Sequence, residues 1–96
     1  MVVTYHEGAV SELAEAVAFY NGRAEGLGQA FAAEVRATLA HVLAHPDIGT
    51  PVRTAVRRVL LRRFPYSILY AVTGETVRVL AVMHHRRRPE RWGERR

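Results

Sequence analysis

The sequence contains no cysteine and no lysine. Without cysteine, the chain has neither disulfides nor a thiolate metal site. No uninterrupted apolar run exceeds five residues, whereas a membrane-spanning helix needs roughly 20. The opening Met1-Val-Val-Thr-Tyr-His6 does not resemble a signal peptide. These absences predict a cytoplasmic protein without a membrane partner.

Every basic residue other than histidine is arginine, and the arginines are unevenly distributed. Residues 1–52 hold six acids and two arginines, net −4, whereas residues 53–96 hold three acids and twelve arginines, net +9. A genome rich in G and C would explain the missing lysines, but it does not explain this crowding. Guanidinium groups pair bidentately with phosphate and carboxylate. The basic half is therefore where function is expected.

The length of 96 residues predicts a single domain, residues 1–96, with a basic C-terminal tail at residues 84–96. Apolar residues at helical spacing predict one helix from about Gly8 to Arg23 and another from about Leu27 to His45. A glycine-rich turn joins them, and Pro46 ends the second. The expected apolar stripes are Val10, Leu13, Val17 and Tyr20 with Ala14, then Leu27, Phe31, Val35, Leu39 and Val42.

The period of the apolar pattern then changes from 3.6 to 2. Val2–Tyr5 is predicted to be an edge or outer strand, residues 46–54 a loop, and residues 56–63, 66–72 and 76–83 strands. Alternation on the last strand groups Val77 and Val79 with Ala81, and Arg78 and Leu80 with Val82. The predicted order is β-α-α-β-β-β, an α+β fold with a helical hairpin packed on a small, twisted, mainly antiparallel sheet.

Three segments together resemble a known group. They are Arg58-Val-Leu-Leu-Arg-Arg-Phe-Pro-Tyr66, the Ile-Leu-Tyr strand that follows, and Val79-Leu-Ala-Val-Met-His-His-Arg-Arg-Arg-Pro-Glu-Arg-Trp92. With the helical hairpin before them, they resemble the RelE/ParE superfamily of type II toxins, the plasmid stabilisation family. The resemblance covers nearly the whole chain. It implies a small growth-inhibiting toxin that a cognate antitoxin protein binds and silences.

The superfamily carries two activities on one fold. RelE-type members cut messenger RNA on the ribosome, whereas ParE-type members poison DNA gyrase and need no nuclease residues. Arg62 or Arg63 matches the arginine of the middle strands, and Arg86 matches the basic residue after the final strand. The terminal tyrosine of the nucleases falls on or near Trp92, whose indole does not exchange a proton at working pH.

The nuclease lysine pair is also replaced, by Val59 and Leu61 or their neighbours. The resemblance is therefore closer to ParE, with gyrase as the target and no catalysis. The alternatives are a RelE-like ribosome-dependent mRNA endonuclease, with the ribosome and mRNA as partners, and a module that retains only antitoxin binding. No cofactor, metal or small-molecule substrate is expected.

The candidate site residues follow from this comparison. If the protein is a nuclease, the catalytic candidates are His84, His85, Arg62 and Arg86; the candidates for target or phosphate binding are Arg62, Arg63, Arg86, Arg87, Arg88, Arg91 and Trp92. Each has a plainer structural interpretation. One histidine would pack into the sheet, one of Arg62 and Arg63 would lie on a covered face, and Trp92 would pin the tail to the body.

Overall fold

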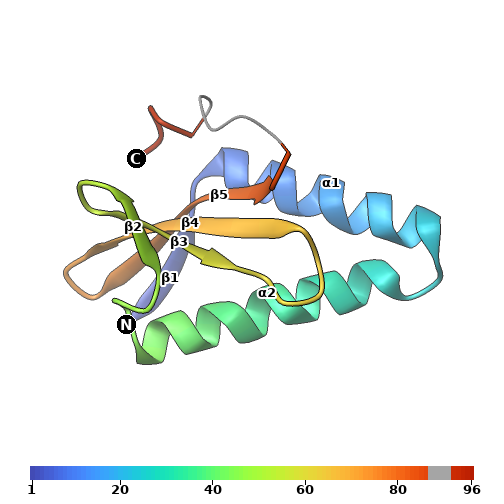
Figure 1. Cartoon of the computed structure of the whole chain (residues 1–96), viewed down its shortest axis with the longest axis horizontal. Coiled ribbons are helices and arrows are strands. Elements are labelled where there is room, and N and C mark those ends of the chain that lie inside the picture. The colour runs from blue at the N-terminus through green and yellow to red at the C-terminus, as the bar shows by residue number, and fades with distance from the viewer. Residues whose placement is uncertain (87–91) are drawn as a thin grey trace.

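A computed structural model describes residues 1–86 and 92–96 of the chain. Two helices, α1 (Glu7–Arg23) and α2 (Leu27–Ala44), form a hairpin (Figure 1). Both lie within one residue of the predicted bounds. His6 precedes α1, and its Nδ1 accepts a hydrogen bond of 2.9 Å from the Gly8 N–H. This side chain satisfies one of the free N–H groups that begin every helix.

The buried face of α2 agrees with the prediction, since Phe31, Val35, Leu39 and Val42 are all buried. The buried face of α1 differs. Val10 is 52% exposed and Ala14 is exposed, whereas Ala9 and Ala16 are buried. Ala9, Leu13, Ala16 and Tyr20 are spaced for one helix face, and the small alanines bring α1 close to its neighbours. The predicted stripe was therefore wrong at Val10 and Ala14, whereas its other members, Leu13, Val17 and Tyr20, do pack against the core.

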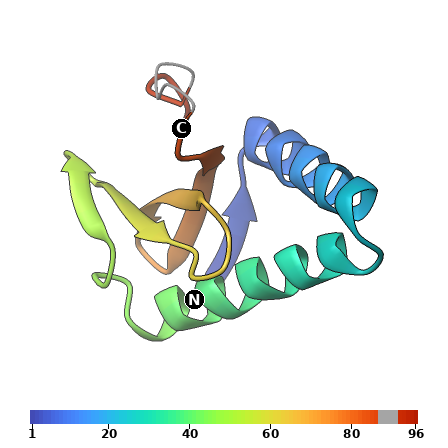
Figure 2. The same cartoon turned by 45° about the vertical axis from the view of Figure 1, so that its right-hand side comes forward.

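The sheet has five strands in the order β1-β5-β4-β3-β2, and its strands are β1 (Val2–Tyr5), β2 (Thr50–Arg53), β3 (Val56–Leu60), β4 (Tyr66–Thr73) and β5 (Thr76–His84). β1 runs parallel to β5 and the other pairs are antiparallel. The α+β class and the edge position of β1 are confirmed. Figure 2 shows α2 along one side of the sheet and the C-terminal residues on the other.

The segment predicted to be a loop, residues 46–54, contains β2. This strand pairs on one side only, its four residues are all exposed, and Pro51 lies within it. An exposed edge strand has no apolar alternation to reveal it, and proline is tolerated there because one side needs no donor.

β3 ends at Leu60, three residues earlier than predicted. Arg62 and Arg63 therefore follow the strand, and both are exposed, so the prediction that one occupies a covered face was wrong. The chain leaves the strand because Leu61 and Phe64 both turn into the core.

An irregularity in β5 changes which of its residues face the helices. Leu69 pairs with Ala81 but Tyr70 pairs with Val79, so Leu80 is an extra residue. A bulge of this kind reverses the alternation beyond it. Val82 consequently joins Val79 in the main core, although simple alternation had grouped Val79 with Ala81.

The core divides into two groups. Tyr20 and Phe31 stack at 5.4 Å between ring centroids, and Phe64 and Tyr66 pack edge-on against Phe31. The second group surrounds the fully buried Tyr70. Among the described residues, neither helix is long and apolar enough to cross a membrane.

Candidate functional site

The end of β5 and the β3–β4 loop are joined at one end of the sheet. The His85 N–H donates to the Pro65 carbonyl at 2.8 Å. In the same loop, the backbone N–H groups of Arg62 and Arg63 both donate to the carboxylate of Glu34 on α2. These contacts hold the backbone and leave the two guanidinium groups outside.

The exposed basic residues at this end are therefore carried on a fixed backbone. Arg62, Arg63, His85 and Arg86 are all exposed. The Arg63 guanidinium lies 5.5 Å from the centroid of the Phe64 ring. We call Arg62, Arg63, His85 and Arg86 the basic end. It can offer charge-assisted hydrogen bonds to carboxylates or phosphates.

A cavity of about 350 Å³ lies beside the basic end, between α1 and the final residues of β5; its lining residues are Glu12, Glu15, Ala16, Phe19, Tyr66, Val82, His84 and Arg86. The His84 ring packs edge-on against Tyr66, with 5.1 Å between centroids. Its Nδ1 accepts a hydrogen bond of 3.0 Å from the Arg86 N–H. In the neutral ring the proton therefore resides on Nε2.

The two histidines are separated as strand alternation requires. His84 lines the cavity and is half-buried, whereas His85 is exposed. The cavity thus brings together His84, Arg86 and Tyr66, a residue that was not among the candidate site residues. A phenol beside an imidazole can take part in proton transfer, so this is the part of the molecule that could do acid–base chemistry.

Several other arginines contact their own chain instead. Arg57 donates to the carbonyl oxygens of Asp47 at 3.0 Å and Gly49 at 2.7 Å. Arg53 and Arg78 also donate to backbone carbonyls. Arg53, Arg57 and Arg78 therefore have partners within the fold, unlike the arginines of the basic end. Because both groups are the same residue type, the sequence could not separate them.

Trp92 packs against the sheet. The Arg53 guanidinium lies 4.9 Å from the centroid of its ring, in agreement with the interpretation that Trp92 anchors the tail. Trp92 is not among the described residues that line the cavity. Of the other candidates, Arg87, Arg88 and Arg91 lie outside the described residues.

The sequence analysis did not identify two acidic residues that contact or line these sites, Glu34 and Glu12. Glu34 lies three residues after Phe31 and directly before Val35, both of which are buried. An acid beside a buried stripe is a signal that could have been noticed. Glu12, which lines the cavity, likewise lies directly before a residue of the helical stripe, Leu13, but the contacts of both acids are to residues distant in sequence. Across residues 1–86 and 92–96, no three histidine, aspartate or glutamate side chains are grouped to hold a metal ion.

Comparison with known proteins places the chain. Residues 3–89 match the family model described as "ParE toxin of type II toxin-antitoxin system, parDE". No curated protein sequence matches the chain. One similar solved structure is described as "Chromosomal ParDE TA system from P. aeruginosa"; its TM-score is 0.69 and its sequence identity 20%, over 88% of this chain and 95% of that chain. The structural likeness shows the fold, and the family match spans nearly the whole sequence. The chain therefore belongs to the ParE family and is a toxin of a type II toxin–antitoxin system.

Proposed function

We propose that this toxin inhibits growth by binding DNA gyrase through its basic end and holding the enzyme on cleaved DNA. The family match favours the ParE-type activity over the RelE-type activity. Binding of this kind needs no proton transfer by the toxin. It needs fixed cationic groups that reach a charged partner.

The observation that carries the proposal is the division among the arginines. Arg53, Arg57 and Arg78 bond to the chain itself, whereas Arg62, Arg63 and Arg86 are exposed at one end of the sheet. Glu34 holds the backbone of Arg62 and Arg63, so this loop loses less freedom on binding than a free tail would. Arg23, Arg36 and Arg58 are exposed elsewhere, but only at this end do three exposed arginines of the described residues lie together on backbone held by hydrogen bonds.

The basic end is tested by expressing variants of the toxin without antitoxin in bacteria. Replacing Arg62, Arg63 and Arg86 together with alanine should abolish the filamentation and DNA-damage response that the parent chain induces. Arg36→Ala is the control, since Arg36 is an exposed arginine on α2. If the triple variant remains fully toxic, or Arg36→Ala is equally impaired, the basic end is not the gyrase contact.

We also propose that the antitoxin covers the apolar surface that the toxin leaves open and places acids opposite its arginines. Val10 and Phe19 on α1 and Leu60 on β3 are each more than half exposed, at 52%, 54% and 52%. A segment that folds on binding can fill such surface as a helix or an added strand. Acidic partners should make association slower as salt rises.

This interaction is tested by co-expressing the toxin with the product of the neighbouring reading frame. Co-purification of the two, with an association rate that falls between low and physiological salt, is the expected result. Failure to recover a complex, or an association rate that salt does not change, contradicts the proposal.

One observation favours a second function, RNA cleavage on the ribosome. Tyr66, His84 and Arg86 meet in the cavity, and such a set could move a proton and stabilise a phosphate. The neighbouring His85 is exposed and does not line this cavity, because adjacent residues at the end of a strand point to opposite faces. The set would therefore have to rely on Tyr66 and His84 for both acid and base.

A further inference from the structure

The C-terminal half of β5 has an open edge. β1 pairs with β5 only as far as Tyr5 opposite Val79. One further backbone bond follows on that side, from the His6 N–H to the Val79 carbonyl at 2.9 Å. β5 continues to His84, and no described strand lies beside residues 80–84 there. Open edges of this kind attract an additional strand.

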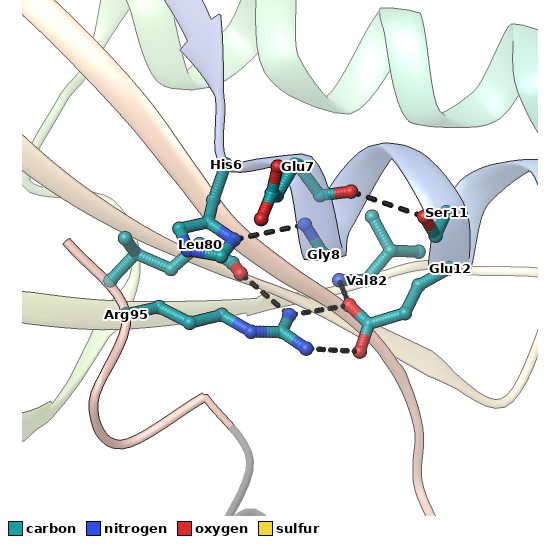
Figure 3. Close-up of polar contacts among 8 residues, drawn as sticks. All are labelled: His6, Glu7, Gly8, Ser11, Glu12, Leu80, Val82 and Arg95. Carbon is teal, nitrogen blue, oxygen red and sulfur yellow. Dashed lines mark hydrogen bonds and ion pairs between the residues drawn. The ribbon is translucent and has the colours of Figure 1, made fainter.

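Two side chains occupy this edge in place of a strand. The Val82 N–H donates to Glu12 Oε1 at 3.0 Å, and Arg95 Nη1 donates to the Leu80 carbonyl at 2.9 Å. Glu12 and Arg95 are themselves paired through both carboxylate oxygens, at 2.9 and 3.0 Å (Figure 3). The carboxylate thus supplies the acceptor, and the guanidinium the donor, that a neighbouring strand's backbone would supply.

Arg95 reaches this position as part of residues 92–96, which we call the C-terminal strap. The Arg95 and Glu12 side chains are only 12% and 19% exposed. Gly8 makes room for the Arg95 guanidinium, since a Cβ there would lie 2.5 Å from Arg95 Cζ. At its other end the strap is held by Arg53, which donates to the Gly93 carbonyl at 2.6 Å.

The strap is docked imperfectly. Trp92 Nε1 is buried and has no hydrogen-bond partner among the described residues. A buried donor without a partner opposes docking, because the same N–H is hydrated when the strap is released. The strap therefore makes specific contacts to the body of the protein, but the unsatisfied Trp92 N–H favours its release and its replacement by another segment.

The open edge continues into the cavity. Glu15 and Phe19 form the α1 wall beside Glu12, and Val82 and His84 form the β5 wall. Phe19 is 54% exposed. The α1 wall carries two acids, Glu12 and Glu15, so its charge is opposite to that of the basic end.

We propose that Glu12, Phe19 and the β5 edge from Leu80 to His84 form a docking site for an arginine-bearing segment of a partner protein. The C-terminal strap is the chain's own occupant of part of this site and competes with the partner segment. Recognition combines a hydrogen bond from the partner's arginine to the Leu80 carbonyl with a bidentate contact between that arginine and Glu12, whose Oε1 also accepts from the Val82 N–H, as Arg95 does in the strap. The site does not depend on gyrase being the target.

A labelled peptide with the strap's own sequence, Trp-Gly-Glu-Arg-Arg, tests the site by fluorescence anisotropy against full-length chains. Arg95→Gln should bind the peptide at least about tenfold more tightly than the parent, because the internal competitor is weakened. Adding Glu12→Gln to Arg95→Gln should remove that gain, whereas adding Glu25→Gln, an exposed acid outside the site, should not. Equal affinity of parent and Arg95→Gln overturns the proposal.

Amide hydrogen exchange provides a second measurement that does not rely on the Glu12 variant. In Arg95→Gln, the peptide should slow exchange at the Val82 N–H. It should leave exchange in β2, at the far edge of the sheet, unchanged. Binding without protection of Val82 would show that the peptide docks elsewhere and would reject the site.

Discussion

At the scale of single residues, Tyr70 shows how one polar atom in the core fixes a loop. Its hydroxyl accepts from the Gly49 N–H at 2.9 Å and donates to the Pro46 carbonyl at 2.9 Å. The ring is fully buried. The hydroxyl therefore ties the segment between α2 and β2 to the centre of the sheet.

Tyr70→Phe should lower the free energy of unfolding by about 1–3 kcal/mol, because it leaves a buried N–H without a partner. Urea denaturation measures this change. Tyr20→Phe is the control, since the Tyr20 hydroxyl has no hydrogen bond among the described residues, and it should cost less than about 0.5 kcal/mol. Equal losses in the two variants would contradict this role of Tyr70.

Tyrosine ionisation should destabilise the fold at alkaline pH. Burial raises the pKa of Tyr5 and Tyr20 above the ordinary 10.0, and the nearby Arg36 partly offsets this for Tyr5. Because the pKa is higher in the fold, the stabilisation is complete below pH 10 and is lost as pH rises through the folded pKa. With no lysine or cysteine in the chain, tyrosinate absorbance and unfolding can be followed together. Tyr20→Phe should reduce the loss; no reduction would contradict the assignment.

The two kinds of function make opposite predictions for neighbouring residues. Arg86→Ala with Arg87→Ala should reduce toxicity more than His84→Ala with His85→Ala, because gyrase binding needs charge-assisted contacts and no proton transfer. In a nuclease, removing the general base would cost about 10²–10⁴-fold in rate. Growth after induction is the measurement, with circular dichroism as the control for folding. Loss of toxicity in a folded histidine variant would reverse the ranking.

At the scale of elements, α1 and α2 approach closely at Gly28. The residue is buried, its N–H donates to Asn21 Oδ1 at 2.9 Å, and a Cβ there would lie 2.4 Å from the Val17 carbonyl oxygen. Backbone cannot move aside as a side chain can. The glycine in the hairpin is therefore required by packing, in addition to marking the turn.

Gly28→Ala should destabilise the fold by about 1–3 kcal/mol, because the added methyl group forces the helices apart. Gly22→Ala is the matched control. Gly22 lies in the last turn of α1 and a Cβ there meets nothing within 4 Å, so alanine should stabilise by up to about 1 kcal/mol. Thermal denaturation of both variants measures the contrast. Two changes of the same sign would contradict the close approach.

The elements also show where sequence reasoning succeeds and where it stops. The extents of both helices and the presence of the three inner strands follow from periodicity, because each buries an apolar face, although the face predicted for α1 included the exposed Val10 and Ala14. The bulge at Leu80 and the exposed strand β2 leave no such pattern, since one depends on pairing with a distant strand and the other buries nothing. The arginine candidates were recognised as a group. Their division into structural and exposed residues depends on partners that only the fold brings near.

At the scale of the whole molecule, the two halves of the sequence become two charged regions. The acidic half supplies the helical hairpin and the basic half most of the sheet, with net charges of −4 and +9. Glu12 and Glu34 join them, through Arg95 and through the loop of Arg62. The arginines that these two acids do not contact carry the remaining positive charge. Under the proposed function, this positive charge is what an acidic antitoxin and gyrase would each contact.

The central claim is that the chain poisons gyrase and cuts no RNA. Its most direct test incubates one preparation of purified toxin with gyrase and supercoiled DNA, and separately with translating ribosomes and message. Linear DNA trapped on gyrase, with intact message, is the predicted result. Cleavage of ribosome-bound message that disappears in His84→Ala or His85→Ala, with no trapped DNA, would contradict the account.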